Sequence, residues 1–172
     1  MRAYPEVYLN DVVENQGKLF DFVAQEYPDK DTEDFIRTYM NSKTRKNIDE
    51  AKAYVNTMSA KELWNYFSET EGYILKSGDA IEGFMPDWIG EFYAYYQWFY
   101  NIPSNIVVQK IPVDFLKKLA KKPFSSSGSP VCFNSLTKLA SMVPVSPRSF
   151  ERTFSSVLSE KSAIFFCAPA PY

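Results

Sequence analysis

Four carboxylates that lie close together in the sequence are the residues whose types and spacing could do chemistry. They are Asp79, Glu82, Asp87 and Glu91. Two of them could meet in space as a general acid and a general base. Acidic residues at the start of a helix also stabilise it through the helix dipole and need no catalytic role, which is the simpler interpretation. Glu82 and Glu91 are the residues to substitute first if an activity is found.

Histidine is absent from the chain, and this absence narrows the chemistry further. It removes Ser-His and Cys-His dyads, histidine general bases and most zinc or iron sites. The six glycines are scattered and form neither a dinucleotide-binding G-x-G-x-x-G motif nor a P-loop. The sequence contains no metal-ligand spacing. We therefore predict a protein that is not an enzyme and that has no cofactor and no metal.

The most conspicuous segment is the aromatic run at residues 86–102, which Pro86 starts and Pro103 stops. On a helical wheel its broad face consists of Trp88, Phe92, Tyr95, Tyr96 and Phe99. Tyr93 and Tyr100 flank this face, and Trp98 points elsewhere. A helix that is apolar almost all round belongs in the middle of its fold. Tyr and Trp are also common interface anchors, so Trp98, Tyr93 and Tyr100 are the candidate partner-binding residues. Base stacking is disfavoured because no basic groove is visible.

Helical patterns position this run within a larger bundle. Apolar spacings of three, four and seven predict a helix at residues 7–26, and Asp31 or Thr32 begins a second. Residues 43–56 allow a short helix with Lys43, Arg45 and Lys46 outside. Ser59 and Glu62 form an S-x-x-E capping box. Residues 70–85 read as a loop, and short helices follow at 104–110, capped by Ser104, and at 112–121.

Composition changes after Phe124. Twelve Ser lie in residues 125–172, which contain a linker-like stretch at 125–130. Within this segment, residues 149–160 could form an amphipathic helix and residues 164–168 a short strand. We expect a mainly α-helical domain at 1–122, a compact bundle around the central aromatic helix. A less regular Ser/Pro-rich segment is expected at 123–172, as a separate or appended module.

The charge of the chain limits the class of partner it can bind, and its cysteines indicate the compartment. The net charge of −2 and the single basic cluster, Lys117 to Lys122, make direct nucleic-acid binding a poor explanation. Cys132 and Cys167 form no C-x-x-C pair, which fits a reducing compartment. No secretory h-region or membrane-length apolar run is visible. We expect a cytoplasmic protein that binds a protein partner, with a homo-oligomer also compatible with the sequence.

Three segments in the same order carry a resemblance: residues 3–11, residues 58–63, and Trp88-Ile89-Gly90 leading to the Tyr-Tyr-Gln-Trp core at 95–98. Over residues 3–121 the chain resembles a family of small helical proteins from gut Firmicutes. That family is encoded in mobile cassettes beside ADP-ribosyltransferase-like toxin genes, and no catalytic residues are established for it. The resemblance implies a helical accessory or antitoxin-like protein. The chain departs from the family after Leu119, where a short acidic helical end would be expected.

Two classes of function follow from these observations. The first is a non-enzymatic, antitoxin-like inhibitor that occludes a partner protein in a stoichiometric complex; an inhibitor of a nucleic-acid-guided nuclease carried by a mobile element would share this mechanism. The second is a small carboxylate-dependent enzyme, against which the absent histidine argues.

Overall fold

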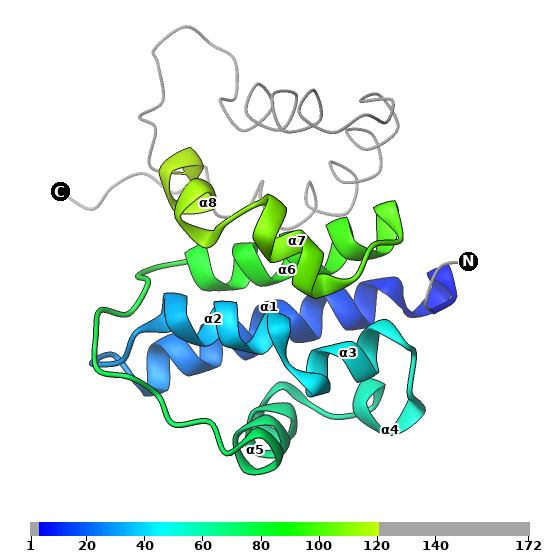
Figure 1. The fold of residues 1–172 in the computed structure, drawn as a ribbon, viewed down its shortest axis with the longest axis horizontal. Coiled ribbons are helices and arrows are strands. Elements are labelled where there is room, and N and C mark those ends of the chain that lie inside the picture. The colour runs from blue at the N-terminus through cyan, green and yellow to red at the C-terminus, as the bar shows by residue number, and fades with distance from the viewer. Residues whose placement is uncertain (1–3, 121–172) are drawn as a thin grey trace, which may run out of the picture. The chain divides into compact units, whose positions relative to one another are not determined.

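A computed structural model describes residues 4–120, with side chains through Lys118 (Figure 1). Its helices are η1 (Glu6–Tyr8, a 3-10 helix), α1 (Leu9–Glu26), α2 (Thr32–Asn41), α3 (Lys43–Asp49), α4 (Ala53–Asn56), α5 (Ala60–Glu71), α6 (Met85–Tyr100), α7 (Ser104–Lys110) and α8 (Val113–Ala120). Residues 4–120 contain no strand, only an isolated antiparallel bridge between Lys30 and Ser77. The mainly α-helical fold class is therefore confirmed. The expectations for residues 123–172, including the helix at 149–160 and the strand at 164–168, lie outside the described residues.

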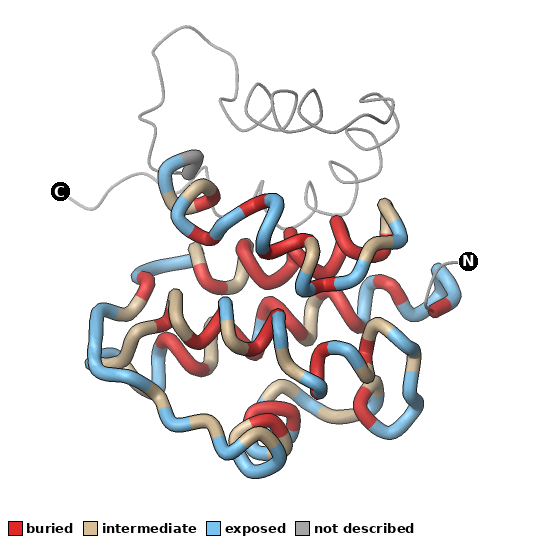
Figure 2. The backbone as a smooth tube through the Cα atoms, in the orientation of Figure 1, coloured by how far each residue is buried: buried red, intermediate tan, exposed pale blue. Residues whose placement is uncertain are grey.

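The centre of the bundle is the pair formed by α1 and α6, which pack against each other along their lengths. Helices α2 and α5 cover other sides of α1, while α7 and α8 pack on α6 and α2. Figure 2 shows the buried backbone concentrated along α1, α2 and α6, with exposed residues on the long α5–α6 loop. The aromatic helix is therefore central, and Phe92, Tyr95 and Tyr96 of its predicted face are buried.

Local sequence signals account for several helix ends. Asp31 caps α2 by accepting a hydrogen bond from Asp34 N, and Ser42 caps α3 in the same way. The capping box of Ser59 and Glu62 at the start of α5 is confirmed, with both reciprocal hydrogen bonds formed. At the end of α6, Asn101 takes the left-handed conformation that Asn tolerates better than most residues.

Two local expectations were wrong. The single helix at 43–56 is broken into α3 and α4, because Ala51 takes a positive φ of 55° between them. Ser104 does not cap α7; Pro103 is the cap residue and Ser104 is the first helical residue, buried against Asp49 of α3. The hydroxyl of Ser104 donates to a distant carboxylate, which local sequence patterns cannot reveal.

The described helices do not include a candidate membrane span, since none between residues 4 and 120 combines the necessary length with the necessary hydrophobicity.

Candidate functional site

The three aromatic residues predicted to bind a partner occupy different positions from those expected. Tyr93 is fully buried, Trp98 is only 2% exposed, and Tyr100 is half-buried. The expectation that Trp98 lies on the surface is wrong. The N-terminal segment covers it, and Trp98 Nε1 donates a hydrogen bond to the carbonyl of Tyr4 over 3.0 Å. The hydroxyl of Tyr93 donates to the carbonyl of Ile111 over 2.6 Å, which ties α6 to the end of α7.

The four carboxylates are divided between two environments. Asp79 and Glu82 are exposed on the α5–α6 loop, whereas Glu91 is buried on α6. Asp87 and Glu91 lie one turn apart on α6 and both face Gly17 of α1. The structure therefore brings Asp87 and Glu91 to the same place but puts Glu82 on a different element. No group of three or more residues suited to hold a metal occurs in the described part of the chain.

Sequence reasoning missed a buried polar network around Arg45. This residue was expected outside, yet its side chain is fully buried. Arg45 Nε donates to Ser104 Oγ over 2.8 Å, and a guanidinium nitrogen lies 3.4 Å from Asp49 Oδ1. Asp49 also accepts from the backbone N and the hydroxyl of Ser104. The i, i+4 spacing of Arg45 and Asp49 was the one available signal, and it equally describes an exposed ion pair.

The hydroxyls of Tyr4 and Tyr39 face the same guanidinium. Burial raises the pKa of Tyr4 to about 12, although the positive charge of Arg45 opposes that increase. Burial raises the pKa of Tyr39 still further against the same opposing charge. Both phenols are therefore neutral at physiological pH and can donate or accept hydrogen bonds inside the core.

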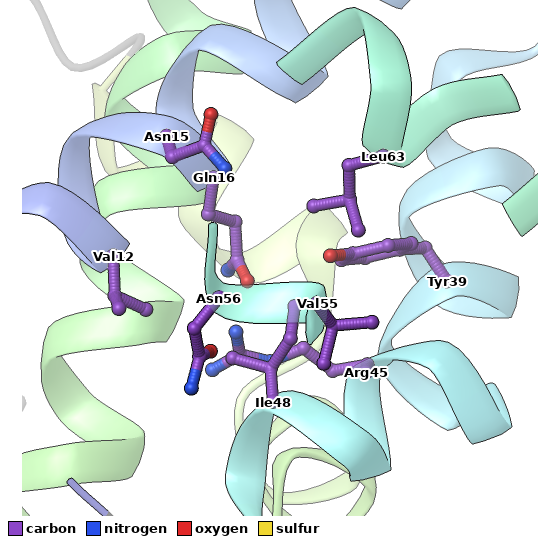
Figure 3. Close-up of a pocket in the computed structure, with 9 residues that line it drawn as sticks. All are labelled: Val12, Asn15, Gln16, Tyr39, Arg45, Ile48, Val55, Asn56 and Leu63. Atoms are coloured by element: carbon purple, nitrogen blue, oxygen red, sulfur yellow. The ribbon is translucent and has the colours of Figure 1, made fainter. Parts of the chain in front are cut away.

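Beside this network lies a small cavity of about 10 Å³ (Figure 3). Its lining residues are Val12, Asn15, Gln16, Tyr39, Arg45, Ile48, Val55, Asn56 and Leu63. They come from five helices, α1 to α5. The cavity is too small for an organic substrate, so the Arg45 network has the properties of a structural core rather than of a reaction centre.

A second, open hollow lies on the surface and has a volume of about 230 Å³. It is lined by Asp11, Glu14, Asn15, Lys18, Asn56 and Met58. Val7 and Tyr8, immediately before α1, are 76% and 56% exposed. Val7, Asp11, Glu14 and Lys18 follow the i, i+4, i+7, i+11 spacing of one helical stripe. We refer to Val7, Tyr8, Asp11 and Glu14 as the N-terminal patch.

The described chain is thus a mainly helical protein with an aromatic central helix, a buried arginine network and a partly apolar, acidic surface patch. Comparison with known proteins adds no relative: no family model, curated protein or solved structure matches the chain.

Proposed function

We propose that this protein is a non-enzymatic, antitoxin-like inhibitor that binds a protein partner in a stoichiometric complex and occludes it. The N-terminal patch is the observation on which this proposal rests. Two large apolar side chains, Val7 and Tyr8, are held in solvent immediately before α1, the helix on which Asp11 and Glu14 line an open hollow. Exposed apolar residues rimmed by polar ones are characteristic of protein interaction sites, and Tyr is a frequent energetic anchor.

The charge of the domain indicates which partner surface would fit. The first 120 residues contain 13 basic and 19 acidic side chains, a net charge of −6, against −2 for the whole chain. Within the N-terminal patch, Asp11 is exposed, and Glu14 is partly exposed and paired with Lys18 over 2.8 Å, so Asp11 is the main source of the negative charge. A partner that presents lysine or arginine beside an apolar side chain would be attracted by this surface and oriented on it.

The proposed location is the cytoplasm, because Cys132 and Cys167 fit a reducing compartment. A stable complex of ordinary size would bury about 800 Å² on each protein. Such an interface involves about 20–30 residues on each side, far more than the four of the N-terminal patch, so the partner would extend beyond it over neighbouring surface.

Site-specific photo-crosslinking tests the proposal. A genetically encoded photoreactive phenylalanine analogue replaces Tyr8 in the full chain, which is expressed in the native host and irradiated. The expected result is one predominant cross-linked protein, identified by mass spectrometry, whose recovery falls in an Asp11→Lys background. Crosslinking from Gln25, an exposed position near the other end of α1, is the matched control and should not trap that protein. Equal trapping from both positions would contradict a role for the N-terminal patch.

A further inference from the structure

The cavity beside Arg45 is lined by buried polar atoms that make no hydrogen bond within the described residues. They are Gln16 Oε1, Tyr39 OH, Arg45 Nη1 and Asn56 Oδ1. Arg45 Nη2 also makes no hydrogen bond, but it lies 3.4 Å from Asp49 Oδ1, within ion-pair distance. Gln16, Tyr39 and Arg45 are all at least nine-tenths buried. Buried polar groups in folded proteins are almost always satisfied, because leaving one unpaired forfeits its hydration without replacement. Four such atoms around one cavity therefore point to a common ligand.

The four atoms define what that ligand must offer. Two are amide oxygens, from Gln16 and Asn56, and can only accept hydrogen bonds. Arg45 Nη1 can only donate, and the hydroxyl of Tyr39 can do either. A ligand that donates twice and accepts once or twice satisfies all of them. A water molecule has this pattern, whereas a halide cannot donate to the amides and a metal cation would face the guanidinium.

The volume of the cavity independently indicates that its ligand is a water molecule. The cavity volume is about 10 Å³, and one water molecule needs roughly 10–15 Å³ measured in this way. A carboxylate, a phosphate or an amino acid is several times larger. In Figure 3 the side chains of Gln16, Tyr39, Arg45 and Asn56 converge on the same space from four helices.

We propose that this cavity is a binding site for a single internal water molecule that bridges α1, α2, α3 and α4. The water donates to Gln16 Oε1 and Asn56 Oδ1 and accepts from Arg45 Nη1, with Tyr39 OH as its fourth neighbour. The oxygen of Asn56 thereby connects the short helix α4 to the buried arginine. This role accounts for the burial of an arginine whose only ion-pair partner, among the described residues, is Asp49.

The structure also indicates how this water would exchange with solvent. Asn15 and Asn56 line both the internal cavity and the open surface hollow. The side chain of Asn15 is held by a hydrogen bond from its Nδ2 to the carbonyl of Met58 over 2.9 Å. Asn56, which is only partly buried, is therefore the residue whose rotation would open the cavity to the hollow.

A high-resolution crystal structure of the full chain tests the site directly. We expect one density peak in the cavity at about 2.7–3.2 Å from at least three of the four polar atoms. A cavity without such a peak, or amides of Gln16 and Asn56 turned so that they bond to protein groups instead, would overturn the proposal.

Water exchange measured by oxygen-17 relaxation dispersion tests the site in solution. The wild-type protein should show one long-lived water, and Asn56→Ala should shorten its residence time at least tenfold. Asn10→Ala, an exposed position on α1 outside both cavities, is the matched control and should leave the residence time unchanged. A residence time unaltered by Asn56→Ala would rule out the proposed bridge and exchange route. The crystal structure decides the matter if that variant does not fold.

Discussion

Gly17 of α1 and Gly90 of α6 lie against each other where the two central helices meet. A methyl group placed on Gly90 would come within 2.8 Å of Gly17 Cα and 2.6 Å of the carbonyl oxygen of Gln16. These are backbone atoms of a helix and cannot move independently. The Gly17–Gly90 contact therefore sets how closely α1 approaches the aromatic helix, and Gly17, a liability by helix propensity, is needed for packing.

The first prediction concerns this contact. Gly90→Ala should lower the free energy of unfolding by about 1–3 kcal/mol, because the added methyl group overpacks a backbone contact. Intrinsic helix propensity alone would change stability in the opposite direction, by about 1 kcal/mol. Urea denaturation measures the difference. Gly17→Ala should cost less, since most of the atoms its methyl group would meet belong to the side chains of Asp87 and Glu91. A stabilised Gly90→Ala variant would show that the helices are not in close contact.

The second prediction tests whether Trp98 is buried, by comparing it with the exposed Tyr8. Trp98→Ala should cost about 3–5 kcal/mol, as expected for removing a buried aromatic side chain. Tyr8→Ala should change stability by no more than about 0.5 kcal/mol, because Tyr8 is mostly exposed. Thermal and urea unfolding of the two variants gives the comparison. Similar small losses for both would mean that Trp98 is at the surface after all.

The third prediction concerns the buried ion pair. Arg45→Met should cost about 3–5 kcal/mol, because it leaves the largely buried Asp49 carboxylate without its counter-charge and removes the donor to Ser104 Oγ. Combining it with Asp49→Asn should cost less than the sum of the two single variants, which a double-mutant cycle measures. Lys46 and Glu50 form an exposed pair with the same spacing on the same stretch of chain. Removing that pair should change stability by less than about 1 kcal/mol, and equal costs for the two pairs would contradict the burial of Arg45.

The fourth prediction is a loss of stability in alkali. Burial raises the pKa of both Tyr4 and Tyr96 to about 12, above the ordinary value of about 10. A raised pKa in the folded state means that the stabilisation is complete below pH about 10 and is lost as the pH rises towards 12. Urea midpoints measured across this range, with tyrosinate absorbance recorded in parallel, should therefore fall. Tyr96→Phe should make the fall shallower, and Tyr8→Phe, an exposed control, should not.

Local sequence patterns predicted the helical elements but not the contacts between them. The capping box at Ser59 and the periodicity of residues 7–26 depend on neighbours in the chain, and both were confirmed. The positions of Trp98 and Arg45 depend on partners far away in sequence: Tyr4 covers Trp98, and Ser104 accepts a hydrogen bond from Arg45. A helical wheel assigns a residue to a face but does not say what covers that face. The sequence prediction therefore placed both side chains wrongly.

The N-terminal patch was missed for a related reason. Val7 shares a helical stripe with Asp11, Glu14 and Lys18 rather than with the buried Leu9 and Val12. The pattern therefore places Val7 off the core but does not show that this stripe stays uncovered. In the structure no residue of η1, which contains both Val7 and Tyr8, is buried.

The last prediction distinguishes a binder from an enzyme. If the protein acts by occlusion, inhibition of the cross-linked partner should increase linearly with added protein and stop near one equivalent. Glu82→Gln should leave this titration unchanged, since Glu82 is exposed on the α5–α6 loop, away from the N-terminal patch in sequence. Glu91→Gln should change stability at most, because Glu91 is buried between α6 and α1. Tyr8→Ala should weaken the complex by about 1 kcal/mol or more while folding is retained, as expected for an interface anchor. Inhibition by far less than one equivalent, abolished by Glu82→Gln or Glu91→Gln in a folded protein, would instead reveal carboxylate-dependent turnover.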